Sequence, residues 1–474
     1  MILSDLVKAV VDRPPLRDLM VSGPTDVVLT RAVHDSRRAE PGVLFCAVTG
    51  ANHDGHDHAR AAVAAGATAV LCERPLDLGV PELRVPSVRT ALGPVAAALA
   101  GRPSDHLSVV GVTGTNGKTT TTHLLGAVLE AAGRPCGVIG TLTGTRTTPE
   151  APDLQAALAD LIVGGREAVA MEVSSHALDL HRVDGTHFSV GVFTNLSRDH
   201  LDHHQDMAAY FAAKARLFEP DLCARAVVNV DDPHGRLLRD AAVIPSTGYS
   251  LADAEALTLN PDGSRFRWRG VEVHLPLAGR FNVYNALAAA AAAAELGIGP
   301  EEVAVGLTAA GAVPGRFELV DEGQPFLAVV DYAHTPDGIE QLLIAARELA
   351  SDRVILVFGA GGDRDRAKRP EMGEVAARLA DVVVLTTDNP RHEAPAVIIS
   401  QVRTGMNETR DVRVEPDRRA AIEVAVRAAG PGDVVLVAGK GHETTQIIGE
   451  AVVAFDDRLV LREALLGAAG ESWS

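Results

Sequence analysis

The stretch "LSVVGVTGTNGKTTTTHLLGAVLEAAG", residues 107–133, joins a short apolar run, a glycine-containing loop and a helical pattern. This order predicts a buried strand that runs through a tight loop into a helix. The loop Gly114–Thr120 is a variant P-loop, because the strict pattern requires glycine where this chain has Val112. In such a loop, backbone N–H groups hold phosphate, Lys118 reaches the terminal phosphates and Thr119 can bind Mg²⁺. A glycine turn with an incidental lysine is the alternative, which the strand–loop–helix context disfavours.

Outward from this loop, strands alternate with helices along the chain. Apolar runs such as "EAVAMEV", "FSVGVFTN" and "ARAVVNV" follow it, and a similar alternation begins again near "VPGRFELV". Such alternation predicts the α/β class with mostly parallel sheets. A chain of 474 residues has room for about three domains. We expect a small α/β domain at 1–104, a central P-loop ATPase domain with a parallel sheet at 105–313, and a Rossmann-like α/β domain at 314–474.

Composition excludes several classes of function. The formal net charge of −18 argues against non-specific nucleic-acid binding, which needs a basic surface. The four cysteines are scattered without metal-ligand spacing, which indicates free thiols in a reducing compartment. The N-terminus lacks the features of a signal peptide, and the longest apolar run, Ala286–Ala294, is far too short to span a membrane. We therefore expect a cytoplasmic protein that is not inserted in a membrane.

One lysine interrupts an apolar helical pattern. Lys214 lies in "YFAAKARLF", residues 210–218, on the face that also carries Tyr210 and Leu217. The chain has only five lysines among 44 basic residues, so lysine is kept where an amine has a use that a guanidinium cannot serve. The five are Lys8, Lys118, Lys214, Lys368 and Lys440. A lysine that extends toward a nearby carboxylate is the ordinary alternative.

Carboxylates and histidines follow two further predicted strands. Glu172 ends the strand in "MEVSSHAL", and "TNLSRDHLDHH" places Asp199 and His200 after the next one. Carboxylate and imidazole at neighbouring strand ends can hold Mg²⁺ beside a nucleotide. Zinc is the rival for so many histidines, but the chain lacks cysteine partners or an H-E-x-x-H pattern.

Four strands of the third segment run directly into polar loops. These loops are "DYAHTPDG", "GAGGDRDRAKRP", "TTDNPRHEAP" and "AGKGHETTQ". Open parallel sheets bind ligands beyond the carboxyl ends of their strands, so we expect the four loops to converge on one crevice.

Ten blocks in this order resemble the Mur ligase family over essentially the whole chain. They are "GTNGKTT", "MEVSSHAL", "TNLSRDHLDHH", "YFAAKARLF", "GRFNVYNALAA", "PGRFE", "DYAHTPD", "GGDRDRAKRP", "DNPRHEAP" and "GKGHET". The resemblance implies an ATP- and Mg²⁺-dependent ligase that adds the third residue of the peptidoglycan stem peptide. It implies that meso-diaminopimelate is joined to UDP-N-acetylmuramoyl-L-alanyl-D-glutamate through an acyl phosphate. We expect these small molecules as partners, no nucleic acid, and a monomer.

The resemblance also assigns roles to individual residues. Catalytic groups are expected at Lys118, Glu172, His200 and Lys214, the last as a carbamate (N6-carboxylysine) that binds metal together with Thr119, Glu172 and His200. ATP is expected at Gly114, Thr115, Asn116, Gly117, Lys118, Thr119, Thr120, Asn285, Arg316, Asp331 and His334. The uridine substrate is expected at His34, Ser36, Ala51, Asn52, His53, Thr147, Thr148, Ser174, Leu180 and Arg182, although the family often has glutamine at position 180. Diaminopimelate is expected at Arg364, Asp388, Asn389, Pro390, Arg391, Gly439 and Glu443.

Within the last group, Arg391 is the family's counterpart for gripping the carboxylate that diaminopimelate has and lysine lacks. An Arg391 that only pairs with Glu393 at the surface is the alternative. Four rival functions follow from the same residues. They are the same ligation with L-lysine, a P-loop phosphotransferase or motor, a non-catalytic nucleotide-binding paralogue, and a ligase similar to folylpolyglutamate synthetase. The loops "DNPR" and "GKGHE" and the intact Lys118 and Lys214 disfavour the last three.

Overall fold

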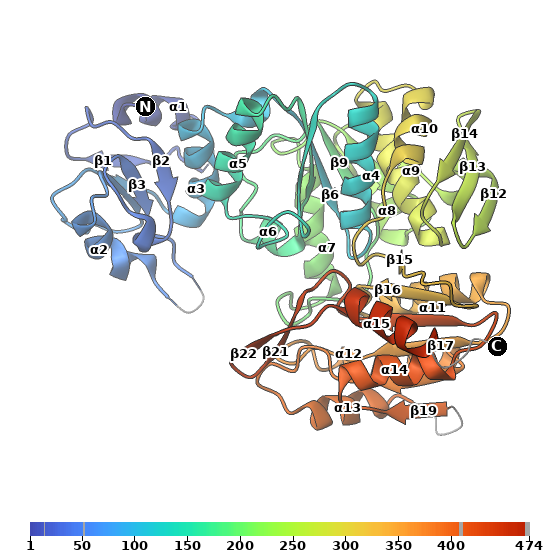
Figure 1. Cartoon of the computed structure of the whole chain (residues 1–474). Helices are drawn as coiled ribbons and strands as arrows, with labels where there is room; N and C mark the ends of the chain where they lie inside the picture. Colours follow the sequence, from blue (N-terminus) through green and yellow to red (C-terminus); the bar gives the residue numbers. More distant parts are fainter. Residues whose placement is uncertain (14, 51–52, 407–410, 470–474) are drawn as a thin grey trace.

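The computed structural model describes residues 1–13, 15–50, 53–406 and 411–469. Three α/β bodies follow one another along the chain, and the C-terminal body lies against the central one (Figure 1). The α/β class with three such bodies is as predicted, whereas the domain boundaries stay a prediction. Within these residues, no helix has both the length and the apolar character needed to cross a membrane.

The N-terminal body is a five-stranded sheet in the order β1-β5-β4-β3-β2. Only β1 runs antiparallel to its neighbour. Its strands are β1 (Met20–Ser22), β2 (Arg31–Val33), β3 (Val43–Cys46), β4 (Ala69–Cys72) and β5 (Glu82–Arg84). Its helices are α1 (Leu3–Val10), α2 (Ala59–Ala64) and α3 (Val88–Leu99). Apolar residues fill β3 and β4 completely, which is typical of strands covered on both faces.

The central body is built on a six-stranded parallel sheet in the order β11-β10-β9-β6-β8-β7. Its strands are β6 (Ser108–Thr113), β7 (Cys136–Ile139), β8 (Ala168–Glu172), β9 (Val190–Phe193), β10 (Ala226–Asn229) and β11 (Ser246–Tyr249). Its helices are α4 (Lys118–Ala131), α5 (Ala151–Val163), α6 (Ser175–Asp179), α7 (Met207–Ala215), α8 (Pro233–Ala241), α9 (Arg280–Glu295) and α10 (Pro300–Ala309). The alanine-rich α9 is buried and packs beside α4 in the same apolar core.

The C-terminal body contains a second six-stranded sheet, in the order β15-β16-β20-β17-β18-β19. Only β15 is antiparallel to its neighbour. The strands are β15 (Glu318–Leu319), β16 (Leu327–Asp331), β17 (Val354–Phe358), β18 (Val382–Leu385), β19 (Asp411–Val414) and β20 (Val434–Ala438). The helices are α11 (Pro336–Leu349), α12 (Lys368–Leu379), α13 (Pro395–Arg403), α14 (Arg418–Ala428) and α15 (Asp457–Ala469).

Two antiparallel additions were not predicted from the sequence. The central body carries a three-stranded meander, and the C-terminal body carries a hairpin after β20. The meander is β12 (Glu255–Asn260), β13 (Gly263–Trp268) and β14 (Val271–Leu275), and the hairpin is β21 (Thr445–Ile448) and β22 (Ala451–Ala454). The meander covers part of the central apolar core, and the hairpin lies beside the polar loops that end the C-terminal sheet.

Candidate functional site

The P-loop lies at the centre of the site because β6 leads directly into it and α4 leads out. Gly117 has a φ of +88° and would place a Cβ 2.3 Å from Asn285 Oδ1, so only glycine fits between the loop and α9. Thr194 donates its hydroxyl to Asn116 O at 2.6 Å, and Asn116 N–H donates to Asn195 Oδ1 at 2.9 Å. The loop is therefore fixed by neighbouring strand ends, and the N-terminus of α4 faces the cavity beside it.

Two lysines converge on one carbonyl of this loop. Lys214 Nζ donates to Gly114 O at 2.7 Å, and Lys118 Nζ donates to the same oxygen at 2.9 Å. Burial lowers the pKa of both amines, and for Lys214 the charge of Lys118 adds to the effect and brings the pKa well below its usual value. Lys214 is 1% exposed and bonds a backbone carbonyl, so the alternative of an ordinary lysine that extends toward a carboxylate is wrong.

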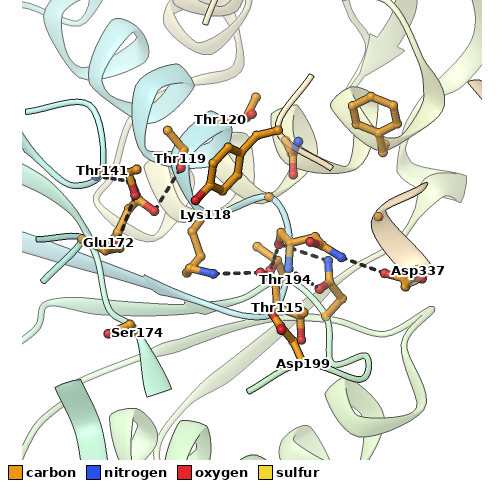
Figure 2. Close-up of a pocket in the computed structure, with 18 of the residues that line it drawn as sticks. Thr115, Lys118, Thr119, Thr120, Thr141, Glu172, Ser174, Thr194, Asp199 and Asp337 are labelled. Atoms are coloured by element: carbon orange, nitrogen blue, oxygen red, sulfur yellow. Dashed lines mark hydrogen bonds between the residues drawn. The ribbon is translucent and has the colours of Figure 1, made fainter. Parts of the chain in front are cut away.

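Glu172 connects the loop to the next strand end. Its Oε2 accepts a hydrogen bond from Thr119 Oγ1 at 3.0 Å, and its Oε1 accepts one from Thr141 N–H at 2.8 Å (Figure 2). Arg316, from the C-terminal body, also donates to Thr119 Oγ1 at 3.0 Å. A hydroxyl, a carboxylate and a guanidinium from separate elements thus meet at the first turn of α4.

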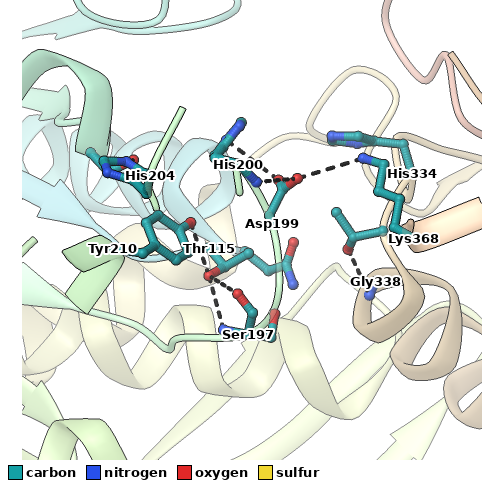
Figure 3. Close-up of polar contacts among 12 residues, drawn as sticks. Thr115, Ser197, Asp199, His200, His204, Tyr210, His334, Gly338 and Lys368 are labelled. Carbon is teal, nitrogen blue, oxygen red and sulfur yellow. Dashed lines mark hydrogen bonds and ion pairs between the residues drawn. The ribbon is translucent and has the colours of Figure 1, made fainter. Parts of the chain in front are cut away.

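His200 and Asp199 extend the site toward the C-terminal body. His200 has a φ of +55°, and its Nε2 lies 3.4 Å from Asp199 Oδ2. Burial lowers the pKa of His200 to about 3, so its imidazole is neutral and able to bind a metal. The other oxygen of Asp199 lies 3.5 Å from Lys368 Nζ at the start of α12 (Figure 3). Lys368 is one of the five lysines and is not among the site residues expected from the sequence.

The histidines near His200 do not form a zinc site. The ring of His176 lies 4.2 to 5.6 Å from the rings of His203, His200 and His204, centroid to centroid. In the described part of the chain, no three His, Cys, Asp or Glu side chains are grouped so that they alone hold a metal ion. A metal here therefore needs further ligands, such as phosphate oxygens.

A cavity of about 770 Å³ lies between the central and C-terminal bodies. Of the residues predicted to bind ATP or metal, those lining it are Thr115, Asn116, Gly117, Lys118, Thr119, Thr120, Glu172, His200, Lys214, Asn285, Arg316, Asp331 and His334. Four of the residues predicted for the uridine substrate also line it, namely Thr147, Thr148, Ser174 and Arg182. The structure thus brings most of these side chains to one cavity, while their roles stay predictions.

Direct contacts hold the two bodies together over the P-loop. Asp337, at the start of α11, accepts hydrogen bonds from Asn116 Nδ2 at 2.7 Å and from Ser197 Oγ at 2.9 Å. Within the C-terminal body, Arg316, which bonds Thr119 across the border, stacks on Tyr332 with its guanidinium carbon 4.4 Å from the ring centroid. Asp337 is not among the residues expected from the sequence, because its partners lie more than a hundred residues away in the chain.

A cluster of arginines lies at the border of the first two bodies. Arg182 Nε lies 2.9 Å from Glu150 Oε1, and Arg89 and Arg146 pair with the same carboxylate at 2.9 and 3.2 Å. Three cations around one carboxylate leave an excess of positive charge there, which suits an anionic ligand. His34, Ser36, His53 and Leu180 are absent from the lining of the cavity among the described residues. Ala51 and Asn52 lie outside the described residues.

The residues predicted to bind diaminopimelate form a separate group at the ends of β17, β18 and β20. Asn389 Nδ2 donates to Glu443 Oε2 at 2.8 Å, and Arg391 Nη1 donates to Gly362 O at 2.8 Å. Gly439 has a φ of +114° and would place a Cβ 2.4 Å from Asp388 Oδ2. Arg364 is close enough to Arg391 to lower its pKa, after the larger effect of burial. Pro390 lies between Asn389 and Arg391 in the same loop.

The prediction that all four C-terminal loops share one crevice is confirmed only in part. Three of them form the group just described, whereas the loop after β16 lines the cavity beside the P-loop in the described chain. The rings of Tyr332 and His442 lie 5.2 Å apart, so they connect the cavity beside the P-loop with the group of residues predicted to bind diaminopimelate. Glu393 is bonded to Arg369 at 2.9 Å, so the alternative in which Arg391 pairs with Glu393 is wrong.

These features define an ATP-dependent ligase of three α/β domains, with a P-loop beside a strand-end carboxylate. Three family models match the chain: "Mur ligase family, catalytic domain" at residues 31–100, "Mur ligase middle domain" at 112–293 and "Mur ligase, glutamate ligase domain" at 315–441. The chain belongs to the Mur ligase family.

Two similar proteins and one solved structure carry the same name. The chain is 45% identical over 470 residues to a UDP-N-acetylmuramoyl-L-alanyl-D-glutamate–2,6-diaminopimelate ligase of Syntrophomonas wolfei, covering 94% of this chain and 96% of that protein. It is 47% identical over 464 residues to the protein of that name in Solibacter usitatus, covering 93% and 94%. A solved structure of a ligase with this name matches 99% of both chains with a TM-score of 0.69 and 34% identity. A folylpolyglutamate synthase of Mycobacterium tuberculosis, at 19% identity, covering 72% of this chain and 90% of that one, and a TM-score of 0.59, shares the fold alone.

Proposed function

We propose that this chain joins meso-2,6-diaminopimelate to the D-glutamate side-chain carboxylate of UDP-N-acetylmuramoyl-L-alanyl-D-glutamate, with conversion of ATP to ADP and phosphate. The name shared by relatives about 45% identical over nearly the whole chain supports this reaction. The observation that carries it is the placement of Lys118, Lys214 and Glu172 in one cavity. The loop that follows β18 and contains Arg391, called the arginine loop below, lies on the adjoining body. This reaction is a step in peptidoglycan synthesis.

The reaction proceeds through an acyl phosphate. The γ-phosphoryl group passes from ATP to the side-chain carboxylate, and the amine of diaminopimelate then attacks the activated carbonyl and expels phosphate. The N-terminus of α4 and Lys118 stabilise the negative charge on the transferring phosphoryl group. Asn285, Arg316 and Asp331 surround the nucleotide, and closure of the C-terminal body keeps water from the acyl phosphate.

A magnesium ion fits the donors in this cavity. Thr119 would supply a hydroxyl, Glu172 a carboxylate and His200 a neutral imidazole, and Lys214 in its carbamylated form would supply a second carboxylate. When bound, the ion neutralises charge on the phosphate oxygens. Carbamylation adds CO₂ to the neutral amine of Lys214 with release of one proton, and the low pKa of this amine favours the step.

Substrates approach from different bodies. The uridine nucleotide lies between the N-terminal and central bodies, where Arg89, Arg146 and Arg182 supply positive charge around Glu150. Diaminopimelate lies on the C-terminal body. We further propose a cytoplasmic monomer, because one chain supplies every predicted site and because ATP is the substrate. Sedimentation equilibrium tests the monomer.

The decisive experiment measures ADP release by the purified protein. With ATP, Mg²⁺ and UDP-N-acetylmuramoyl-L-alanyl-D-glutamate, release is expected only after addition of meso-diaminopimelate, and far more slowly with L-lysine. Omission of the uridine precursor is the control for idle ATP hydrolysis. Release that is independent of the amino acid, or equal efficiency with lysine, contradicts the proposal.

A further inference from the structure

Lys440 is one of the five lysines and has no role in the steps above. It is the second residue after β20 and is 0% exposed. Its ammonium donates to Thr445 O at 2.6 Å, to Glu443 Oε2 at 3.0 Å and to Asn389 Oδ1 at 3.2 Å. An ammonium has three N–H donors, so these three acceptors use all of them. The lysine is therefore fully engaged in holding parts of the amino-acid site.

The contact with Asn389 determines which way its amide faces. Asn389 Oδ1 also accepts the backbone N–H of Ile447 at 3.0 Å. A backbone N–H and an ammonium can only donate, so the oxygen must face them. The amide NH₂ then faces Glu443, whose Oε2 it contacts at 2.8 Å. The loop thus presents an N–H donor beside a carboxylate acceptor, in a fixed order.

The hairpin after β20 holds Arg391 in the same way. Arg391 N–H donates to Ile447 O at 3.1 Å, and Gly449 N–H donates to Arg391 O at 2.7 Å. Thr445, whose carbonyl binds Lys440, begins the first strand of this hairpin. Lys440 therefore connects Asn389, Glu443 and the strand that supports Arg391.

We propose that Lys440 is a positioning residue that sets the polarity of the amino-acid site. A zwitterionic amino-acid end needs a donor for its carboxylate and an acceptor for its ammonium, and Lys440 orients Asn389 and Glu443 to provide both. This inference rests on the proposed function. Arginine cannot replace Lys440, because a larger planar group does not fit a fully buried site built for three divergent donors.

The test compares Lys440→Met with wild type in steady-state kinetics. Loss of the three hydrogen bonds that the charged ammonium donates is expected to raise the KM for meso-diaminopimelate by about 10- to 100-fold. The KM values for ATP and the uridine precursor stay within about twofold of wild type. Hydroxylamine, which traps the acyl phosphate without using the amino-acid site, supports the same rate of ADP release in both proteins. Arg353→Met is the control, because its partner Asp433 is buried at the other end of the strands, just before β20 begins.

A double-mutant cycle distinguishes positioning from general destabilisation. If Lys440 acts through Asn389, then Lys440→Met in an Asn389→Leu background raises the KM for the amino acid by less than about threefold. An unchanged KM for diaminopimelate in Lys440→Met, or equal increases for all three substrates that follow a lowered melting temperature, overturns the inference. Wild-type protein that releases no ADP in response to diaminopimelate refutes the proposed function instead.

Discussion

Replacement of Arg391 tests which amino acid the chain uses. Its guanidinium is half-buried and donates to Gly362 O at 2.8 Å, while Glu393 is bonded to Arg369. Burial lowers the pKa of Arg391, and the positive charge of Arg364 lowers it further. A carboxylate placed between these two guanidinium groups offsets both the loss of hydration and the repulsion between the two positive charges. Diaminopimelate supplies that carboxylate and lysine does not, so we expect Arg391→Ala to remove the preference between them.

The size of the effect follows from the exposure of the side chain. Removing one partner of a buried, hydrogen-bonded charge pair costs about 2–5 kcal/mol. Arg391 is only half-buried, so screening by water places the cost in the lower part of that range, at about 3 kcal/mol. At about 1.4 kcal/mol for each tenfold change, kcat/KM for diaminopimelate falls about 100-fold.

The backbone conformation of Arg391 is unfavourable for alanine, so a second variant is needed. Arg391 has a φ of +51°, in the left-handed region, where alanine adds strain of its own. Asparagine tolerates this conformation, so Arg391→Asn removes the charge with less strain. Arg366→Ala is the control, because this exposed arginine pairs with Glu393 and its loss changes kcat/KM by less than about twofold.

The assay measures amino-acid-dependent ADP release with meso-diaminopimelate and with L-lysine at saturating ATP and uridine precursor. The ratio of the two kcat/KM values is the quantity of interest, because it cancels any loss of active protein. A ratio that Arg391→Asn leaves at the wild-type value refutes the reasoning.

Three further predictions concern charge in buried places. Lys214→Arg loses most activity because a guanidinium cannot be carbamylated, and Lys214→Ala recovers part of it when acetate is added; initial rates of ADP release report both. Arg418→Met lowers the free energy of urea unfolding by about 3–5 kcal/mol, because Asp457, its partner at 2.7 Å with 0% exposure, is left buried and unpaired. Arg418→Met with Asp457→Leu recovers most of that loss. Burial lowers the pKa of His176 from 6.5 to about 4, so the unfolded chain binds the proton at a higher pH than the folded chain. The free energy of unfolding therefore falls as the pH drops from 6.5 to about 4. His176→Gln reduces this dependence on pH, as measured by denaturant titrations at several pH values.

Features that are local in the chain could be predicted from the sequence. The P-loop is continuous from β6 to α4, and its glycines are needed by the backbone itself, as at Gly117. The arginine loop was found because an apolar strand, β18, runs directly into polar residues. In both places the pattern of burial and the residues that carry chemistry are adjacent in sequence.

Features that depend on distant pairs could not be predicted in this way. Asn116 and Asp337 are separated by 221 residues. The residues next to each of them in the sequence give no sign that the two side chains meet. The hairpin after β20 is largely exposed along its second strand, so its apolar residues do not mark a buried strand. The meander does contain a usable signal, because β13 alternates between buried and exposed positions along "RFRW".

The site's least expected feature, two buried amines at one carbonyl, explains why lysine and not arginine occupies position 214. Two ammonium groups that share Gly114 O repel each other, and burial together with the charge of Lys118 holds the pKa of Lys214 well below its usual value. The neutral amine is the form that reacts with CO₂. Under the proposed function, carbamylation would give Lys214 a negative charge that attracts Lys118, and it would add an oxygen ligand beside Glu172 and His200. A guanidinium there stays positively charged and keeps the repulsion.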